Sequence, residues 1–452
     1  MSHSPDLAIT SQRVITPDGE KAAAVLIKDE KILDVLPIDD IQNDCPIEDM
    51  GNDVVMPGLV DVHVHINEPG RTDWEGFETA TKAACAGGIT TLVDMPLNCN
   101  PVTTNMGAFN AKITSTQKKL WVDCGFYGGL IPDNLHEIES LAKAGVLGFK
   151  AFMSHSGIDE FPKVSEQNLR DILFILAKYN LPLLVHAELE DGDNTTDDLI
   201  TYESYMATRP KSWENNAIKL LISLCAEFQT PIHIVHLSSS EILNEISSAR
   251  ENGLPITVET CPHYLHFTAE KIADGDTRFK CAPPIRDANN REQLWRGLKS
   301  GIIDFITSDH SPCQPELKKL SEGRFDKAWG GISSVQLTLP IIWSECKNEG
   351  LSLAQLTNWL CDAPAKFIGM NDCKGQILPG KDADITCWDP DESFLVEPAM
   401  IHYKHKLTPY DGEQLFGVVK KTFLRGNKIF DNNRFTNGPL GKPLYSSYDK
   451  KN

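Results

Sequence analysis

Between residues 56 and 375, short runs rich in β-branched and other apolar residues alternate with longer segments of helical periodicity. This alternation is typical of repeated βα units, whose strands form a parallel sheet. Eight strand candidates predict an α/β fold, a (β/α)8 TIM barrel, in which active sites lie at the C-terminal ends of the strands. An open, doubly wound sheet is the alternative. The expected strands are 59–65, 90–96, 121–129, 147–153, 182–188, 232–238, 256–264 and 304–310, and the expected helices are 135–144, 166–179, 213–227, 241–252 and 291–300.

The two ends of the chain have a different pattern. Residues 1–55 contain short apolar runs separated by turns, too few to bury both faces of a sheet. Further β-rich runs follow the barrel segment, at 383–389 and 418–429. We therefore expect a small β-sandwich domain built from residues 1–55 and 376–435, a barrel over 56–375, and a polar, poorly ordered tail over 436–452.

The composition of the chain restricts the kinds of molecule that it is expected to bind. The chain has 452 residues, 41% of them hydrophobic, and a formal net charge of −20. Without a basic run, it is not expected to bind nucleic acid or an anionic membrane. The N-terminus lacks the pattern of a secretory signal, and no apolar stretch reaches the roughly 18 residues of a membrane span. The 12 cysteines include no Cys-x-x-Cys pair, which favours reduced thiols in a cytoplasmic protein.

Residues able to bind a metal stand near the ends of several expected strands. His63 and His65 close the first strand, and period-2 alternation places them on one face. A lone histidine is more often a hydrogen-bonded core residue than a ligand. Here the pattern recurs at matching ends, which predicts a metal site. The later strands contribute Lys150, His186, His233, His236 and Asp309.

Lys150 stands inside an otherwise apolar strand. A salt bridge, or a side chain extended towards the barrel rim, would be the ordinary explanation. An ammonium group beside metal cations would be repelled by them. Addition of carbon dioxide to the amine gives an anionic carbamate, whose oxygens can bridge two metals.

The run 61–65, together with Lys150, His186, His236 and Asp309, resembles the cyclic amidohydrolases of the amidohydrolase superfamily. That group includes dihydroorotases, hydantoinases and allantoinases, and the resemblance covers nearly the whole chain. Runs 65–77 and 308–313 look most like the allantoinase branch, which implies opening of the allantoin ring to allantoate. Dihydroorotase, hydantoinase and dihydropyrimidinase activities are the alternatives. Some relatives are structural or assembly proteins that have lost the ligands, but all six ligand positions are present here.

The resemblance also implies a role for each ligand. His63, His65 and Asp309 would hold one divalent ion, His186 and His236 the other, and carboxylated Lys150 (N6-carboxylysine) would bridge them. His236 is preferred to His233 because the two face opposite sides of a strand and His236 lies nearer its C-terminal end. Asp309 would be catalytic, passing a proton from the attacking water to the departing nitrogen. Zinc is the expected metal, with manganese, cobalt or iron as alternatives, and a homotetramer is the expected assembly.

Further polar residues are candidates for binding a small cyclic ureide. Asn67 stands where dihydroorotases carry an arginine, and its neutral amide suits a substrate without a carboxylate, although it could instead stabilise a turn. His155 stands where hydantoinase-like relatives carry an oxyanion-stabilising tyrosine. Segment 313–329 is expected to be a mobile lid, and the acidic run 190–200 a solvated loop. The predicted substrate-binding set is Asn67, Asn98, His155, His263 and Ser311.

Overall fold

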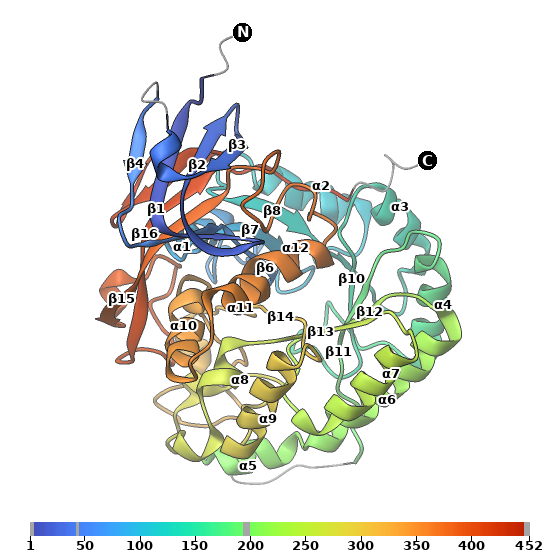
Figure 1. Cartoon of the computed structure of the whole chain (residues 1–452). Coiled ribbons are helices and arrows are strands. Elements are labelled where there is room, and N and C mark those ends of the chain that lie inside the picture. The colour runs from blue at the N-terminus through green and yellow to red at the C-terminus, as the bar shows by residue number, and fades with distance from the viewer. Residues whose placement is uncertain (1–3, 42–44, 193–198, 447–452) are drawn as a thin grey trace.

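The computed structural model describes residues 4–41, 45–192 and 199–446. Its centre is a closed barrel of parallel strands (Figure 1). One arc of the barrel has the order β6-β7-β8 and the other the order β14-β13-β12-β11-β10-β9. Only Tyr127 separates β8 from β9, and a parallel bridge between Val64 and His310 joins the remaining edges. The strands are β6 (Leu59–Val64), β7 (Ile89–Asp94), β8 (Asp123–Phe126), β9 (Gly128–Gly129), β10 (Phe149–Phe152), β11 (Leu183–His186), β12 (Ile232–Ile234), β13 (Ile256–Thr260) and β14 (Phe305–Ile306).

The predicted barrel is therefore confirmed, and the open doubly wound sheet is wrong. Several expected strands are too long, such as 232–238, observed as β12, and 304–310, observed as β14. The expected strand 256–264 ends as β13 at Thr260, and the helix α8 (Pro262–His266) follows. Proline suits the first turn of a helix, where its missing N–H has no partner to lose.

The helices that follow the strands surround the barrel (Figure 1). In α4 (Glu166–Leu176), Leu169, Ile172, Leu173 and Leu176 are buried at helical spacing, and Ser165 caps the N-terminus. All five expected helices form, with shifted ends. Besides α4 and α8, the α-helices of the described residues are α1 (Phe77–Ala86), α2 (Met106–Ser115), α3 (Ile138–Lys143), α5 (Tyr202–Thr208), α6 (Lys211–Phe228), α7 (Leu243–Glu251), α9 (Ala288–Lys299), α10 (Thr338–Asn348), α11 (Leu353–Thr357) and α12 (Ala363–Phe367). No helix in these residue ranges is long and apolar enough to cross a membrane.

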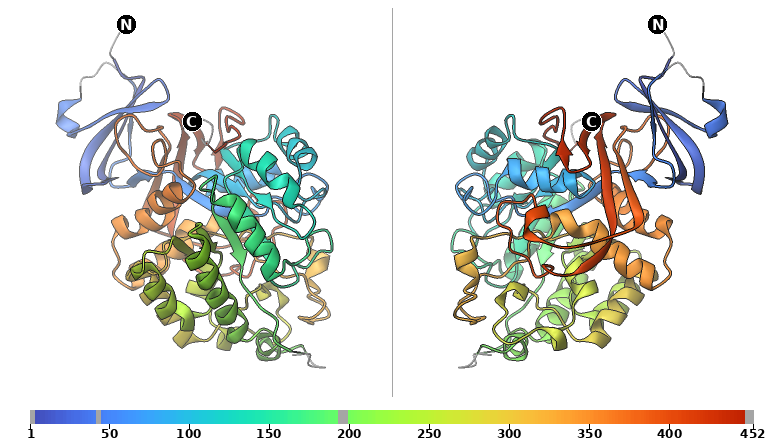
Figure 2. Two further views of the ribbon diagram at one scale, coloured as in Figure 1. Left: turned by 90° about the vertical axis from the view of Figure 1, so that its right-hand side faces the viewer. Right: turned by 90° about the vertical axis from the view of Figure 1, so that its left-hand side faces the viewer.

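Strands from both ends of the chain share one nine-stranded sheet beside the barrel (Figure 2). Its order is β18-β17-β16-β15-β5-β1-β2-β3, with β4 paired to β1. Side chains of both terminal segments, such as Val25, Val55, Ile385 and Phe423, pack into one apolar core. The expected β-sandwich from the two termini is thus confirmed, while the exact division of the chain at residues 55 and 375 stays a prediction. The strands are β1 (Leu7–Thr16), β2 (Gly19–Lys28), β3 (Lys31–Leu36), β4 (Ile47–Asp49), β5 (Val54–Pro57), β15 (Ile385–Leu395), β16 (Gln414–Leu424), β17 (Asn427–Asp431) and β18 (Arg434–Phe435).

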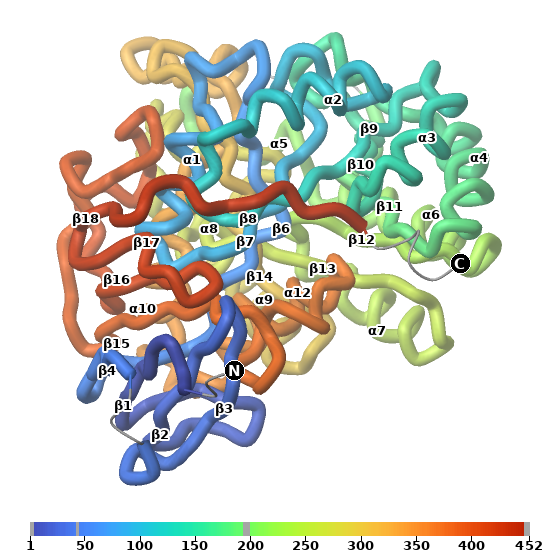
Figure 3. The backbone as a smooth tube through the Cα atoms, turned by 90° about the horizontal axis from the view of Figure 1, so that it is seen from above, coloured from blue at the N-terminus to red at the C-terminus, as the bar shows by residue number. Residues whose placement is uncertain are grey.

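The polar tail is ordered further than expected. Residues 440–446 run along β8 on the side away from β7 (Figure 3). The Cys124 amide donates to the Lys442 carbonyl at 3.0 Å, and the Leu444 amide donates to the Cys124 carbonyl at 2.9 Å. This pairing satisfies backbone groups that β8 leaves free on that edge. The expectation of a poorly ordered tail is wrong for these residues, while 447–452 lie outside the described part.

A buried group of charges joins the sheet to the barrel. The Lys374 ammonium lies 2.7 Å from Asp123 on β8 and 2.6 Å from Asp384, the residue before β15. Asp382 is 3.0 Å away, and the Arg425 guanidinium contacts Asp123 at 2.5 Å. Burial alone would lower the pKa of Lys374, but the surrounding aspartates raise it well above its usual value.

Candidate metal centre

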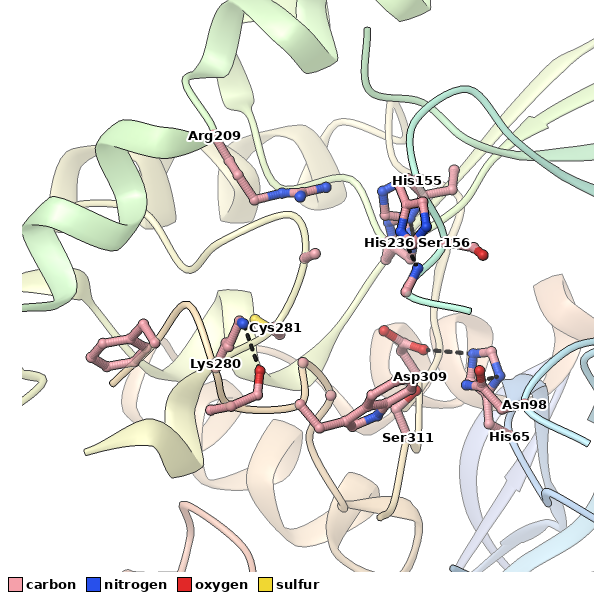
Figure 4. A pocket seen from close by; sticks show the side chains of 18 of the residues that line it. His65, Asn98, His155, Ser156, Arg209, His236, Lys280, Cys281, Asp309 and Ser311 are labelled. Atoms are coloured by element: carbon pink, nitrogen blue, oxygen red, sulfur yellow. Dashed lines mark hydrogen bonds and ion pairs between the residues drawn. The ribbon is translucent and has the colours of Figure 1, made fainter. Parts of the chain in front are cut away.

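The C-terminal ends of the barrel strands open into a cavity of about 530 Å³ (Figure 4). All six predicted metal ligands line it: His63, His65, Lys150, His186, His236 and Asp309. Each is buried. Strands far apart in the sequence therefore deliver their polar ends to one enclosed space, as a barrel does.

The first group of donors comes from β6 and the segment after β14. Nε2 of His63 lies 3.2 Å, and Nε2 of His65 3.4 Å, from Oδ1 of Asp309. One ligand atom from each residue lies within 4.8 Å of the other two, close enough to share an ion. Burial lowers the pKa of His65 to about 4, so its imidazole is neutral, the form that binds metal.

The second group comes from β11 and the segment after β12. Nδ1 of His186 lies 2.9 Å from Nε2 of His236, so these two nitrogens converge on one place. His233 instead faces away from the cavity, where its ring nitrogens contact Thr257 at 2.8 Å and Glu259 at 3.1 Å. This placement agrees with the preference for His236 as the ligand.

Lys150 is fully buried on β10, and its Nζ has no hydrogen-bond partner among the described residues. Burial lowers the pKa of Lys150 to about 7, although Asp309 and Glu259 oppose the shift. An amine with a lowered pKa has a substantial neutral fraction near neutral pH, and the neutral amine is the form that adds carbon dioxide. An unpaired amine in this cavity fits the carbamate hypothesis.

Asp309 carries the charge needed by a metal ligand and a proton acceptor. Burial alone would raise the pKa of this carboxyl, but His63, His65 and His263 around it hold the pKa well below its usual range. Asp309 and His236 both have a left-handed backbone, with φ of 43° and 40°. Such a conformation costs about 1–3 kcal/mol in a residue other than glycine and is concentrated at functional sites.

Two carboxylates behind the ligands were not singled out from the sequence. Glu259 on β13 contacts Nδ1 of His63 and Nε2 of His233. Glu188, just after β11, accepts from Nε2 of His186 at 2.6 Å. Both carboxylates are fully buried. In the sequence, each stands in an expected strand that also contains a histidine, and a charged residue there could have indicated a buried partner for a ligand.

The predicted substrate-binding residues divide into two sets. Asn98, His155 and Ser311 line the cavity, and the Asn98 amide also lies 3.3 Å from Nδ1 of His65. Asn67 and His263 are not among the described residues that line it. The Asn67 side chain donates to the Pro312 carbonyl at 3.1 Å and its φ is 66°, a backbone conformation typical of a turn, while its role in substrate binding stays a prediction. His263 is enclosed beside Asp309, behind the cavity wall.

Segment 313–329 forms part of the cavity wall. Leu317, Phe325 and Trp329 line the cavity, and the Phe325 ring stacks on Tyr205 of α5 at 5.4 Å. Its position over the site agrees with that of a lid, while its mobility stays a prediction. The acidic run 190–200 falls mostly on residues 193–198, which lie outside the described part.

The donor set fits two divalent ions. Four imidazoles, one carboxylate and an unpaired amine occupy a buried cavity, and neighbouring nitrogens of His186 and His236 face each other with no carboxylate between them. Buried polar atoms ordinarily have partners, and cations at the two donor groups would supply them.

The chain matches the model of the Amidohydrolase family over residues 54–429. An allantoinase from Arabidopsis thaliana is 47% identical, in an alignment that covers 96% of this chain and 90% of that protein. An allantoinase from Streptomyces avermitilis is 45% identical, with 97% and 98% covered. Among solved structures, the L-hydantoinase (dihydropyrimidinase) from Arthrobacter aurescens has a TM-score of 0.90 at 30% identity, covering 98% of this chain and all of that one.

The chain therefore belongs to the amidohydrolase family. The resemblance to cyclic amidohydrolases, and within them to the allantoinases, is confirmed over nearly the full length.

Proposed function

We propose that this protein is a metal-dependent hydrolase that opens the five-membered ring of allantoin to give allantoate. The observation that carries the proposal is the convergence of all six predicted ligands on one buried cavity at the C-terminal end of the barrel. Allantoinases of 45–47% identity over nearly the whole chain support the choice of substrate. The retained ligands argue against a structural relative that has lost catalysis.

His63, His65 and Asp309 would hold one divalent ion, and His186 and His236 the other. Lys150, carboxylated on Nζ, would bridge them. When bound, the ions would polarise the ring carbonyl and lower the pKa of water. Zinc is the metal we infer, with manganese, cobalt or iron as alternatives.

Asp309 moves the proton in this proposal. Its carboxylate lies within 3.4 Å of both histidines of the first group, at the cavity surface, where it can accept a proton from the attacking water. It then delivers that proton to the ring nitrogen as the C–N bond breaks. The water oxygen becomes part of the new carboxyl group, whose remaining proton is released to solvent to give the carboxylate, and the nitrogen leaves as a neutral amide of the ureido group. Asn98 and Ser311, in the cavity wall, can orient the ring by hydrogen bonds.

A neutral ureide suits the cavity better than a carboxylate-bearing ring. Asn67 takes the place of the arginine that the resemblance assigns to dihydroorotases, and its amide is used on Pro312. Besides Lys150, three cationic side chains of the described residues line the cavity, and each has a partner. Glu188 neutralises Arg209, the Lys280 ammonium donates to the Ala328 carbonyl at 2.6 Å, and the Lys327 ammonium lies 3.5 Å from Glu322.

We further infer a cytoplasmic homotetramer. The support for the compartment is the thiol state: the 12 cysteines, all within the described ranges, form no disulfide. The support for the assembly is family resemblance alone. Size-exclusion chromatography with light scattering, at several protein concentrations, tests it.

Substrate choice is tested with metal-replete protein by measuring kcat/KM for allantoin, dihydroorotate, hydantoin and dihydrouracil. We expect allantoin to exceed dihydroorotate at least a hundredfold, which corresponds to about 2.7 kcal/mol of transition-state stabilisation. Comparable efficiency on dihydroorotate, or none on allantoin, would defeat the assignment of substrate. Turnover of another ring in the panel would still leave a cyclic amidohydrolase.

A further inference from the structure

We propose that Arg209 and Glu188 form a positioning pair that presents His186 to the second metal ion. The inference rests on the proposed function, because it assumes that His186 is a ligand. The two residues lie outside the ligand set. When their contact is broken, the two metal positions should lose affinity to different extents.

The His186 ring has two different neighbours. Its Nε2 lies 2.6 Å from Oε2 of Glu188, and its Nδ1 lies 2.9 Å from Nε2 of His236. A neutral imidazole carries one N–H, and Glu188 as a carboxylate can only accept it. The proton is therefore held on Nε2, which leaves the Nδ1 lone pair directed at the place that His236 also faces. Fixing a ligand's tautomer through its other nitrogen is how outer carboxylates strengthen metal sites.

Glu188 needs a second partner to do this. It is fully buried, and a buried carboxylate is costly unless it is paired. Arg209 supplies the pairing in a two-pronged contact, with Nε 3.1 Å from Oε1 and Nη2 on Oε2. Both carboxylate oxygens are thereby held, so Glu188 cannot rotate away from His186.

Arg209 is itself held from behind. It follows α5 directly, and its carbonyl accepts from Nη1 of Arg286 at 2.7 Å. The hydroxyl of Tyr205 in α5 donates to the Cys281 carbonyl at 2.6 Å. Figure 4 shows the guanidinium group reaching from this loop towards His236. Through Glu188, the loop that holds Arg209 therefore fixes the orientation of His186, which lies 23 residues earlier in the chain.

The first donor group has an equivalent arrangement built from other residues. Glu259 contacts Nδ1 of His63, which leaves Nε2 facing Asp309, and His233 holds the other oxygen of Glu259 at 3.1 Å. Each donor group thus has one histidine backed by a buried carboxylate, and each carboxylate has its own second partner. Because the two supports share no residue, breaking one should weaken one metal position selectively.

The test is Arg209→Met, which keeps an apolar side chain of similar reach and removes the fork. Arg170→Met is the matched control: on α4, Arg170 contacts one oxygen of Glu166 through Nε and Nη2, at 3.0 and 2.8 Å, in a pair that is partly exposed and does not line the cavity. Metal-free full-length proteins would be titrated with Co²⁺ in bicarbonate, with binding followed by calorimetry and by the visible cobalt spectrum. Circular dichroism and thermal melting would confirm folding.

We expect wild type and Arg170→Met to bind two ions per chain with the same affinities. In Arg209→Met, one ion should bind as in wild type and the other about 10- to 100-fold more weakly, the usual effect of losing an outer partner. Arg209→Lys, which keeps the charge without the fork, should fall between them. Should Arg209→Met fail to fold, Glu188→Gln provides the same comparison and should show the same selective loss.

Wild-type affinity for both ions in a folded Arg209→Met protein would overturn the inference. Equal weakening of both ions would also overturn it, since that result indicates a general structural role. Failure of the proposed function looks different, because wild type itself would then bind fewer than two ions or would leave allantoin intact.

Discussion

Replacing Lys374 with methionine should destabilise the protein strongly, because Lys374 neutralises a buried acidic cluster between sheet and barrel. Its side chain is 2% exposed and lies within 3.0 Å of Asp123, Asp382 and Asp384. Removing one partner of a buried ion pair costs about 3–5 kcal/mol, since the remaining charges stay buried. Arg425 still contacts Asp123 and limits the loss, but within the described residues no other cation forms an ion pair with the Asp384 side chain.

For domains of 150–250 residues, the melting temperature falls by at least about 2 °C for each kcal/mol of lost stability. At that rate, the melting temperature of Lys374→Met should be about 6–10 °C below that of wild type. Differential scanning calorimetry at one scan rate measures this. Lys366→Met is the control, because Lys366 pairs with Asp362 at 2.6 Å but is 57% exposed. An exposed pair contributes about 0–1 kcal/mol. A melting temperature for Lys374→Met within the range of that control would refute the reasoning about buried charge.

Three further changes test other parts of the structure. Lys150→Ala should lose most bound metal and activity, measured by elemental analysis and turnover, and acetate or propionate should restore a little of the activity. Asp309→Asn should lower turnover by about 10²- to 10⁴-fold with a smaller loss of metal. Burial alone would lower the pKa of His266, but hydrogen bonds to Glu345 and Glu413 raise the pKa above its ordinary 6.5. Protonated His266 therefore stabilises the fold below pH 6.5 and loses that effect as pH rises through the raised pKa, so the stability difference between wild type and His266→Gln should shrink as pH rises above 6.5.

Each of these expectations has a contrary outcome. Full metal content and turnover in Lys150→Ala would remove the carbamate from the account. Near-normal turnover in metal-replete Asp309→Asn would move the proton transfer to another group, with His263 beside it as the next candidate. A stability difference for His266→Gln that stays constant with pH would show that its charge does not stabilise the fold.

The convergence of the candidate ligands could be predicted because strand geometry is local. Alternation alone places His63 and His65 on one face, and it separates His236 from His233 three residues earlier. The barrel then brings strand ends together wherever the βα pattern continues. Lys150 was informative for the same reason, since a lysine inside an apolar strand requires an explanation.

The supports of the site could not be predicted, because they depend on contacts between distant segments. Glu188 was visible beside His186, but nothing in the sequence connects it to Arg209 after α5. The side chain of Asn67 is of a type that can bind a substrate, whereas its backbone has the left-handed conformation of a turn. Its hydrogen bond to the Pro312 carbonyl joins segments that are 245 residues apart, so the sequence could not predict it. The tail was polar enough to predict disorder, yet its backbone pairs with β8, and backbone pairing is independent of side-chain polarity.

We propose that allantoin is hydrolysed at a site of two metal ions. The most direct measurement is allantoate formation by metal-free protein in bicarbonate, reconstituted stepwise with Zn²⁺ or Co²⁺. Activity should rise until two ions are bound per chain and then reach a plateau. Full activity with a single ion per chain, or no allantoate at any metal content, would contradict it.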